Sequence, residues 1–127
     1  MKFKILSLLF LFVASKTFSQ EHKNRCSLKV VSAEPVVWND KLKYYKVIIS
    51  NGNKKAMDAC EWTATFYDKF DKYIGEAIGK WSSGAIIDPI QPGEKLTDRE
   101  TPKNIGDVDR IVILINKVHF FDGTVCQ

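Results

Sequence analysis

The residues of this 127-residue chain that could act as nucleophile and base together are its cysteines and His119. A catalytic dyad of that kind needs a thiolate held beside an imidazole, and Cys60 or Cys126 would have to supply the thiolate. Cys60 alternates with apolar residues, so we expect it to face the core as a small hydrophobic side chain. The chain carries no serine-hydrolase elbow, zinc-protease helix motif, phosphate-binding loop or dinucleotide fingerprint. We therefore predict no catalytic residue, no cofactor and no metal ligand.

A second candidate is the stretch TFYDKFDKYIG, residues 65–75, where Asp68 and Asp71 lie among four aromatic rings. Paired carboxylates of this kind serve in general acid–base catalysis or calcium binding. The residues before Asp68 alternate as in a strand, and apolar residues resume at Tyr73-Ile74. Aspartates between two strands usually accept hydrogen bonds from their own backbone amides. We predict a hairpin turn rather than a site.

The first twenty residues have the parts of a secretory signal peptide. Lys2 and Lys4 form a positive start, an apolar run follows from Ile5 to Ala14, and small residues precede a cut before Gln20 or Glu21. Removing residues 1–20 takes away three lysines and leaves 16 basic and 15 acidic residues. A charge so close to balance gives no support for a nucleic-acid partner. We predict an exported protein, periplasmic or secreted, made of the signal peptide 1–20 and one domain, 21–127.

The rest of the chain reads as short strands separated by turns. The segments 59–68 and 44–50 have strand-like composition, and Asn51-Gly52-Asn53, QPGE at 91–94 and Asp122-Gly123 are turn signals. No amphipathic helix of ordinary length is apparent, and no later run is long and apolar enough to span a membrane. This pattern predicts an all-β, immunoglobulin-like β-sandwich of about seven antiparallel strands.

Three segments in this order carry a resemblance to a family: VIISNGNKKAMDACEWTATFYDKF, DPIQPGE and VHFFDGT. They resemble the small bacterial exported immunoglobulin-like or fibronectin-III-like modules of the FxLYD type, over roughly residues 28–125. The resemblance implies a β-sandwich without fixed catalytic residues. The three cysteines depart from the family pattern and leave the function open.

In an oxidising compartment, three cysteines are expected to form one disulfide and leave one free thiol. Their spacing fits neither a zinc site nor a redox motif. The predicted topology gathers all three at one end of the sandwich. Because Cys60 should face the core, we favour Cys26–Cys126, which ties the chain ends, with Cys26–Cys60 as the alternative.

Two surfaces are candidates for binding. Ile111, Ile113 and Ile115 alternate with Val112 and Leu114; if the latter pair faces the core, the three isoleucines form an outer apolar face. That face would serve an unknown protein partner or self-association, unless a loop of the same chain covers it.

The second surface would be an aromatic platform made by Trp38 and Trp81, on which sugar rings stack. From these features we predict a non-catalytic structural or protein-interaction module, with carbohydrate binding as the alternative.

Overall fold

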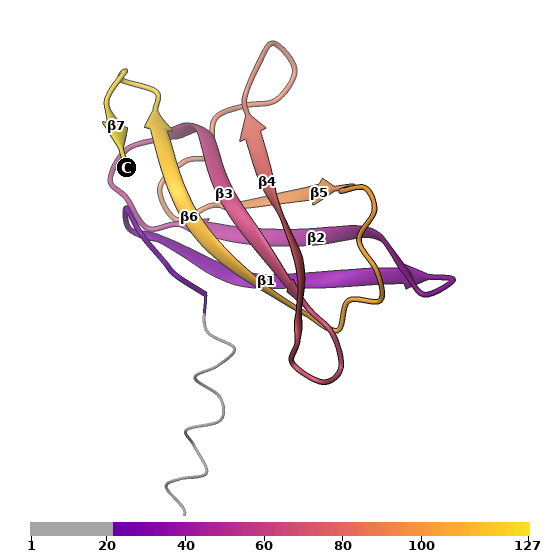
Figure 1. Ribbon diagram of the computed structural model, residues 1–127. Coiled ribbons are helices and arrows are strands. Elements are labelled where there is room, and N and C mark those ends of the chain that lie inside the picture. The colour runs from indigo at the N-terminus through magenta and orange to yellow at the C-terminus, as the bar shows by residue number, and fades with distance from the viewer. Residues whose placement is uncertain (1–21) are drawn as a thin grey trace, which may run out of the picture.

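The protein folds as a sandwich of two antiparallel β-sheets (Figure 1). The structure, a computed structural model, describes residues 22–127, so the predicted signal peptide lies outside the described residues. No helix is present in residues 22–127, and none there is long and apolar enough to cross a membrane. The strands are β1 (Leu28–Trp38), β2 (Lys41–Asn51), β3 (Met57–Tyr67), β4 (Tyr73–Ser82), β5 (Lys95–Glu100), β6 (Arg110–Phe120) and β7 (Val125–Cys126).

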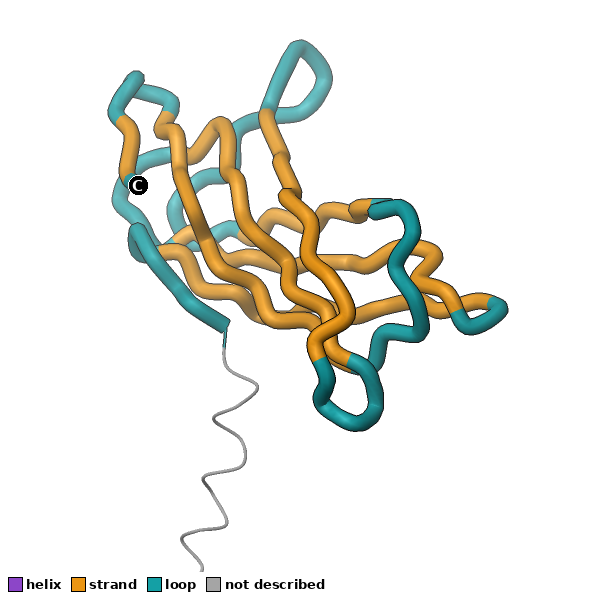
Figure 2. Tube along the Cα trace, in the orientation of Figure 1, coloured by secondary structure: helices purple, strands orange, loops and turns teal. Residues whose placement is uncertain are grey.

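One sheet has the strand order β1-β2-β5 and the other has β4-β3-β6-β7. The two sheets face each other, and all connections between strands are loops and turns (Figure 2). The predicted class, a sandwich of about seven antiparallel strands, is confirmed. Pro35 does not interrupt β1, because that strand lies at the edge of its sheet, where a missing N–H is tolerated.

The core is organised around β3, whose alternation follows the predicted pattern. Cys60, Trp62, Ala64 and Phe66 are all buried. The indole N–H of Trp62 donates a 2.8 Å hydrogen bond to the hydroxyl of Tyr45 on the opposite sheet, so the one polar atom of this ring is satisfied inside the core. On the neighbouring strand β4, Gly79 faces the same ring, and a Cβ there would lie 2.2 Å from Trp62 Nε1. Only glycine leaves room for the indole.

The predicted outer face of β6 is wrong. Ile111, Ile113 and Ile115 point into the core and are 3%, 0% and 0% exposed, whereas Val112 and Leu114 are partly exposed on the outer side. The reason is a β-bulge. Glu61 on β3 pairs with Lys117, and Trp62 pairs with Ile115, which leaves Asn116 as an extra residue. One extra residue exchanges the two faces of a strand. An alternation counted back from buried Phe120 therefore assigns the residues before Asn116 to the wrong faces.

The segment before β1 covers part of the edge of β6. Lys23 forms a parallel bridge with Leu114, and its N–H donates to the carbonyl of Ile113 over 2.8 Å. The N–H of Ile113 donates to Nδ1 of His22 over 2.9 Å. Burial lowers the pKa of His22, which favours the neutral ring that can accept this bond. β7 pairs with the other end of β6 at Val118 and His119, so both halves of this edge are occupied.

A disulfide joins Cys26 to Cys126, the pairing favoured from the sequence, with their Cα atoms 6.0 Å apart. It connects the start of the domain to its end across 100 residues. Cys60 is free and buried, and burial raises the pKa of its thiol to about 12. This thiol therefore stays protonated and unreactive at neutral pH.

Candidate interaction surfaces and polar sites

The predicted aromatic platform does not form. Trp38 is 67% exposed at the end of β1, but Trp81 is 9% exposed and belongs to the core. The end of β1 and the end of β4, which carry these two residues, also lie far apart in the sandwich (Figure 1). Trp81 faces inward because it alternates with Lys80 and Ser82, which are exposed on the outer face. A single exposed indole remains where two were expected.

The turn predicted at residues 68–71 is confirmed. Oδ1 of Asp68 accepts hydrogen bonds from the backbone N–H groups of Phe70 and Lys72, at 2.8 and 3.0 Å. Asp71 adopts a positive φ of 66° and forms an ion pair with Arg110. The two carboxylates thus hold the hairpin and its neighbour in place.

His119 has a partner that the sequence did not reveal. Its Nδ1 lies 2.5 Å from Oδ1 of Asp58, and the two residues sit on adjacent strands of the same sheet. A carboxylate on Nδ1 orients an imidazole and leaves Nε2 available, which is the arrangement of a general base.

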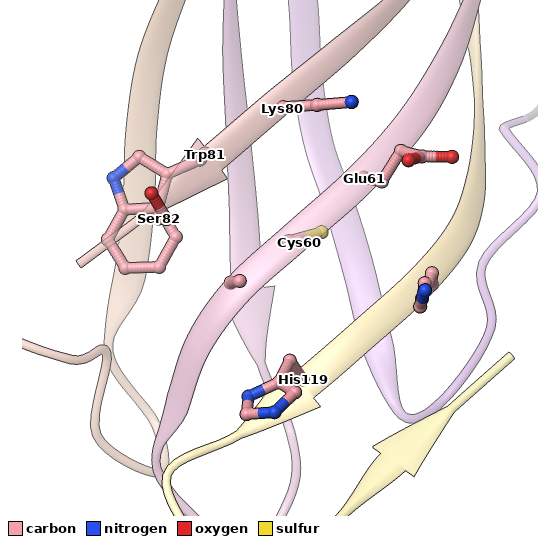
Figure 3. A pocket seen from close by; sticks show the side chains of 8 residues that line it. Cys60, Glu61, Lys80, Trp81, Ser82 and His119 are labelled. Carbon is pink, nitrogen blue, oxygen red and sulfur yellow. The ribbon is translucent and has the colours of Figure 1, made fainter. Parts of the chain in front are cut away.

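His119 borders a hollow of about 370 Å³ on the outer face of the four-stranded sheet (Figure 3). Ser82, Ala59 and His119 occupy one row across three strands, and Lys80, Glu61 and Lys117 occupy the next. No hydrogen bond joins Ser82 to His119 in residues 22–127. Cys60 lies next to the hollow in sequence, but its thiol is buried on the core side. The row of Lys80 and Lys117 on either side of Glu61 has mixed charge, which favours neither an anion nor a cation.

A carboxylate pair lies at the open side of the sandwich between β4 and β5. Asp98 and Glu100 share the inward face of β5 with Leu96, and Glu100 lines a small hollow with Tyr45 and Ala77. Burial, followed by the neighbouring Asp98 carboxyl, raises the pKa of Glu100 to about 7. Glu100 is therefore protonated in a substantial fraction of molecules at neutral pH.

This raised pKa predicts a pH-dependent stability. The folded protein holds a proton on Glu100 between its usual pKa of 4.5 and about 7, whereas the unfolded chain releases it. The contribution of this group is thus complete below pH 4.5 and is lost as the pH rises through 7. The quantity to compare is the free energy of unfolding of Glu100→Gln minus that of the wild type. After allowance for solvent screening, we expect this difference to be about 1 kcal/mol larger, in favour of the variant, at pH 8 than at pH 5. Urea titrations of both proteins at the two pH values measure this, and an unchanged difference would contradict it.

Three connections meet at one end of the sandwich: residues 52–56, 83–94 and 121–124 (Figure 1). Ile86 is 94% exposed, Ile87 52% and Phe121 69%. The β4–β5 loop carries Ile86 and Ile87, and the β6–β7 turn carries Phe121; we call these exposed side chains of two separate loops the loop patch. The N–H of Phe121 donates to the carbonyl of Ala56, so the β6–β7 turn is fastened to the β2–β3 loop.

Asn51 holds these loops together from inside. It is 0% exposed, and its side-chain amide donates to the carbonyls of Lys55 and Ile90 at 3.0 Å each. Its backbone N–H donates to Glu94, and its carbonyl accepts from Gly93. A fully satisfied buried amide fixes the loops that it joins. The sequence marked Asn51 only as part of a turn signal, and its partner Ile90 lies 39 residues away.

No family model matches this chain, and no curated protein matches it significantly. The resemblance to FxLYD-type modules therefore stays a prediction. Among solved structures, the chain is similar to the X-ray structure of Northeast Structural Genomics Consortium target SoR45, with 16% sequence identity, a TM-score of 0.44 and 79% of each chain covered.

Proposed function

We propose that this protein is a non-catalytic, exported module that binds another protein through the loop patch. The observation that carries the proposal is Ile86, an apolar side chain 94% exposed on the β4–β5 loop, whose later part is held by Asn51 at Ile90. Binding residues often lie on loops presented by a rigid scaffold. The turn that carries Ile86 is closed by a 2.8 Å hydrogen bond from the N–H of Gly84 to the carbonyl of Ile87. An ordered loop loses less conformational entropy on binding than a disordered one.

The polar hollow supports a catalytic function less well. Its one oriented imidazole, His119, has no thiol or hydroxyl bonded to it among the described residues, since Cys60 faces the core and Ser82 makes no bond to the ring. A histidine paired with Asp58 across adjacent strands also stabilises the sheet, as cross-strand pairs of opposite polarity do.

Export is supported by the signal peptide predicted at residues 1–20 and by the disulfide. Disulfides persist in oxidising compartments and are rare where thiols are kept reduced. The Cys26–Cys126 bond is in keeping with such a compartment. The predicted resemblance to FxLYD-type modules also implies an exported protein without catalytic residues.

Variants of the loop patch test the proposal. We expect Ile86→Asp and Phe121→Asp each to weaken capture of the partner from the producing cells by at least about tenfold, because a charge must then be desolvated in the interface. Phe70→Asp is the matched control, since Phe70 is 89% exposed on the turn at the opposite end. Circular dichroism of each variant verifies the fold. Equal capture by all three variants would contradict binding through this patch.

A further inference from the structure

The outer edge of β4 has unpaired backbone groups. The N–H of Ser83 donates to the carbonyl of Asp58, so these two opposed residues form a hydrogen-bonded pair. Such pairs recur at every second residue in an antiparallel ladder. In the β3–β4 register the N–H and C=O groups of Ala77 and Gly79 therefore point toward β3, and those of Ile78 and Lys80 point away from it.

The other sheet edges are protected, whereas the outer edge of β4 has no hydrogen-bonded neighbour within residues 22–127, although Thr101 and Pro102 of the following loop line a hollow with Ala77 and Ile78. β5 has six residues and four of them are charged, and β1 carries Pro35 and irregular pairing. The edge of β6 is covered by Lys23 and β7. β4 has ten residues, contains no proline, and makes no backbone hydrogen bond along its outer edge to any residue from 22 to 127. A long unprotected edge is a template for another strand.

The exposed side chains of this edge are complementary to themselves. Glu76, Ile78 and Lys80 all lie on the outer face, and Ile78 is 54% exposed. If two β4 strands pair antiparallel about a two-fold axis at Ile78, each Glu76 lies opposite Lys80 of the second copy, and the two Ile78 side chains meet. An axis at Lys80 would instead set the lysines against each other. Opposite charges stabilise facing positions in a sheet, and like charges destabilise them.

We propose that β4 is an interface between two copies of this chain, which pair antiparallel about Ile78 into one continuous eight-stranded sheet. In this register the opposed residues are those whose backbone N–H and C=O groups point away from β3. Each of the three opposed pairs, Glu76–Lys80, Ile78–Ile78 and Lys80–Glu76, can therefore exchange two backbone hydrogen bonds, about six in all. The interface is isologous and closes on itself, so it yields a dimer and not a fibre. It goes beyond the proposed function and uses different residues from the loop patch.

Sedimentation velocity of the domain over about 10 to 500 μM tests this dimer. We expect the wild type to shift from monomer to dimer with concentration, and Ile78→Pro to remain monomeric. Proline fits at residue 78 because its N–H is not used within the chain, and proline is tolerated on edge strands. A monomer at all concentrations, or a dimer that persists in Ile78→Pro, would overturn the proposal.

Charge exchange tests the register. Lys80→Glu and Glu76→Lys should each weaken association by about fivefold or more, and the double variant should recover most of the loss, because the pairs are then restored in reverse. Lys95→Glu, an equal charge change on β5, is the control and should have no effect. A double variant weaker than either single variant would overturn the pairing.

If a variant misfolds, hydrogen exchange of the wild type decides. The amides of Ile78 and Lys80 should become protected as concentration rises, while those of Ala77 and Gly79 are protected at every concentration. Exchange of Ile78 that is independent of concentration would contradict a β4 interface.

Discussion

Replacing Cys26 and Cys126 by serine is expected to lower the free energy of unfolding by about 4 kcal/mol. The disulfide closes a loop with a sequence separation of 100 residues, so its loss returns much conformational freedom to the unfolded chain. The free energy of unfolding of a domain is typically about 5–15 kcal/mol, so this change removes a large share of it. It also frees β7, which has two residues and pairs only with β6.

Urea unfolding of the double serine variant and the wild type measures the effect. Cys60→Ala is the matched control, because it removes a cysteine that forms no disulfide and should cost about 1 kcal/mol. Peptide mapping without reduction should find Cys26 linked to Cys126. A linked peptide that contains Cys60, or equal stability of the serine variant and the wild type, would contradict this assignment.

Ile113→Lys is expected to abolish folding or to lower the free energy of unfolding by at least about 4 kcal/mol. Ile113 is 0% exposed between the sheets, so the ammonium group would be buried without a partner. Val112→Lys is the control, because Val112 is the adjacent residue on the partly exposed outer side of the same strand. It should change the stability by about 1 kcal/mol at most.

The comparison of these two lysine variants by circular dichroism and urea unfolding decides which face of β6 is inside. If Ile113→Lys were as stable as Val112→Lys, the isoleucines would lie on the outer face, as first predicted from the sequence.

Regular alternation made β3 predictable. Its inward residues from Cys60 to Phe66 follow period two without interruption, and the structure buries all of them. The same reasoning failed for β6, because the bulge at Asn116 appears only in the pairing with β3 and not in the hydrophobic pattern. An apolar run in which both faces are at least partly buried has no polar residues to reveal its phase.

The polar sites could not be predicted for a related reason. Asp58 and His119 are separated by 61 residues, and Asn51 and Ile90 by 39, so each contact depends on strand register and loop path. Trp81 was predicted to lie on an exposed aromatic platform together with Trp38. In the structure, Gly79 faces the core with Trp81, to make room for Trp62. The disulfide was accessible from the sequence, because Cys60 belongs to a clear inward face and the other two cysteines lie at the chain ends.

The most direct test of the proposed function is photo-crosslinking from the loop patch. A benzophenone amino acid placed at Ile86 in the full chain, in the producing cells, should yield an adduct of one discrete mass. The same group at Phe70, an equally accessible position at the opposite end of the sandwich, should yield none. No adduct from residue 86, or the same adduct from residue 70, would contradict a partner that binds the loop patch.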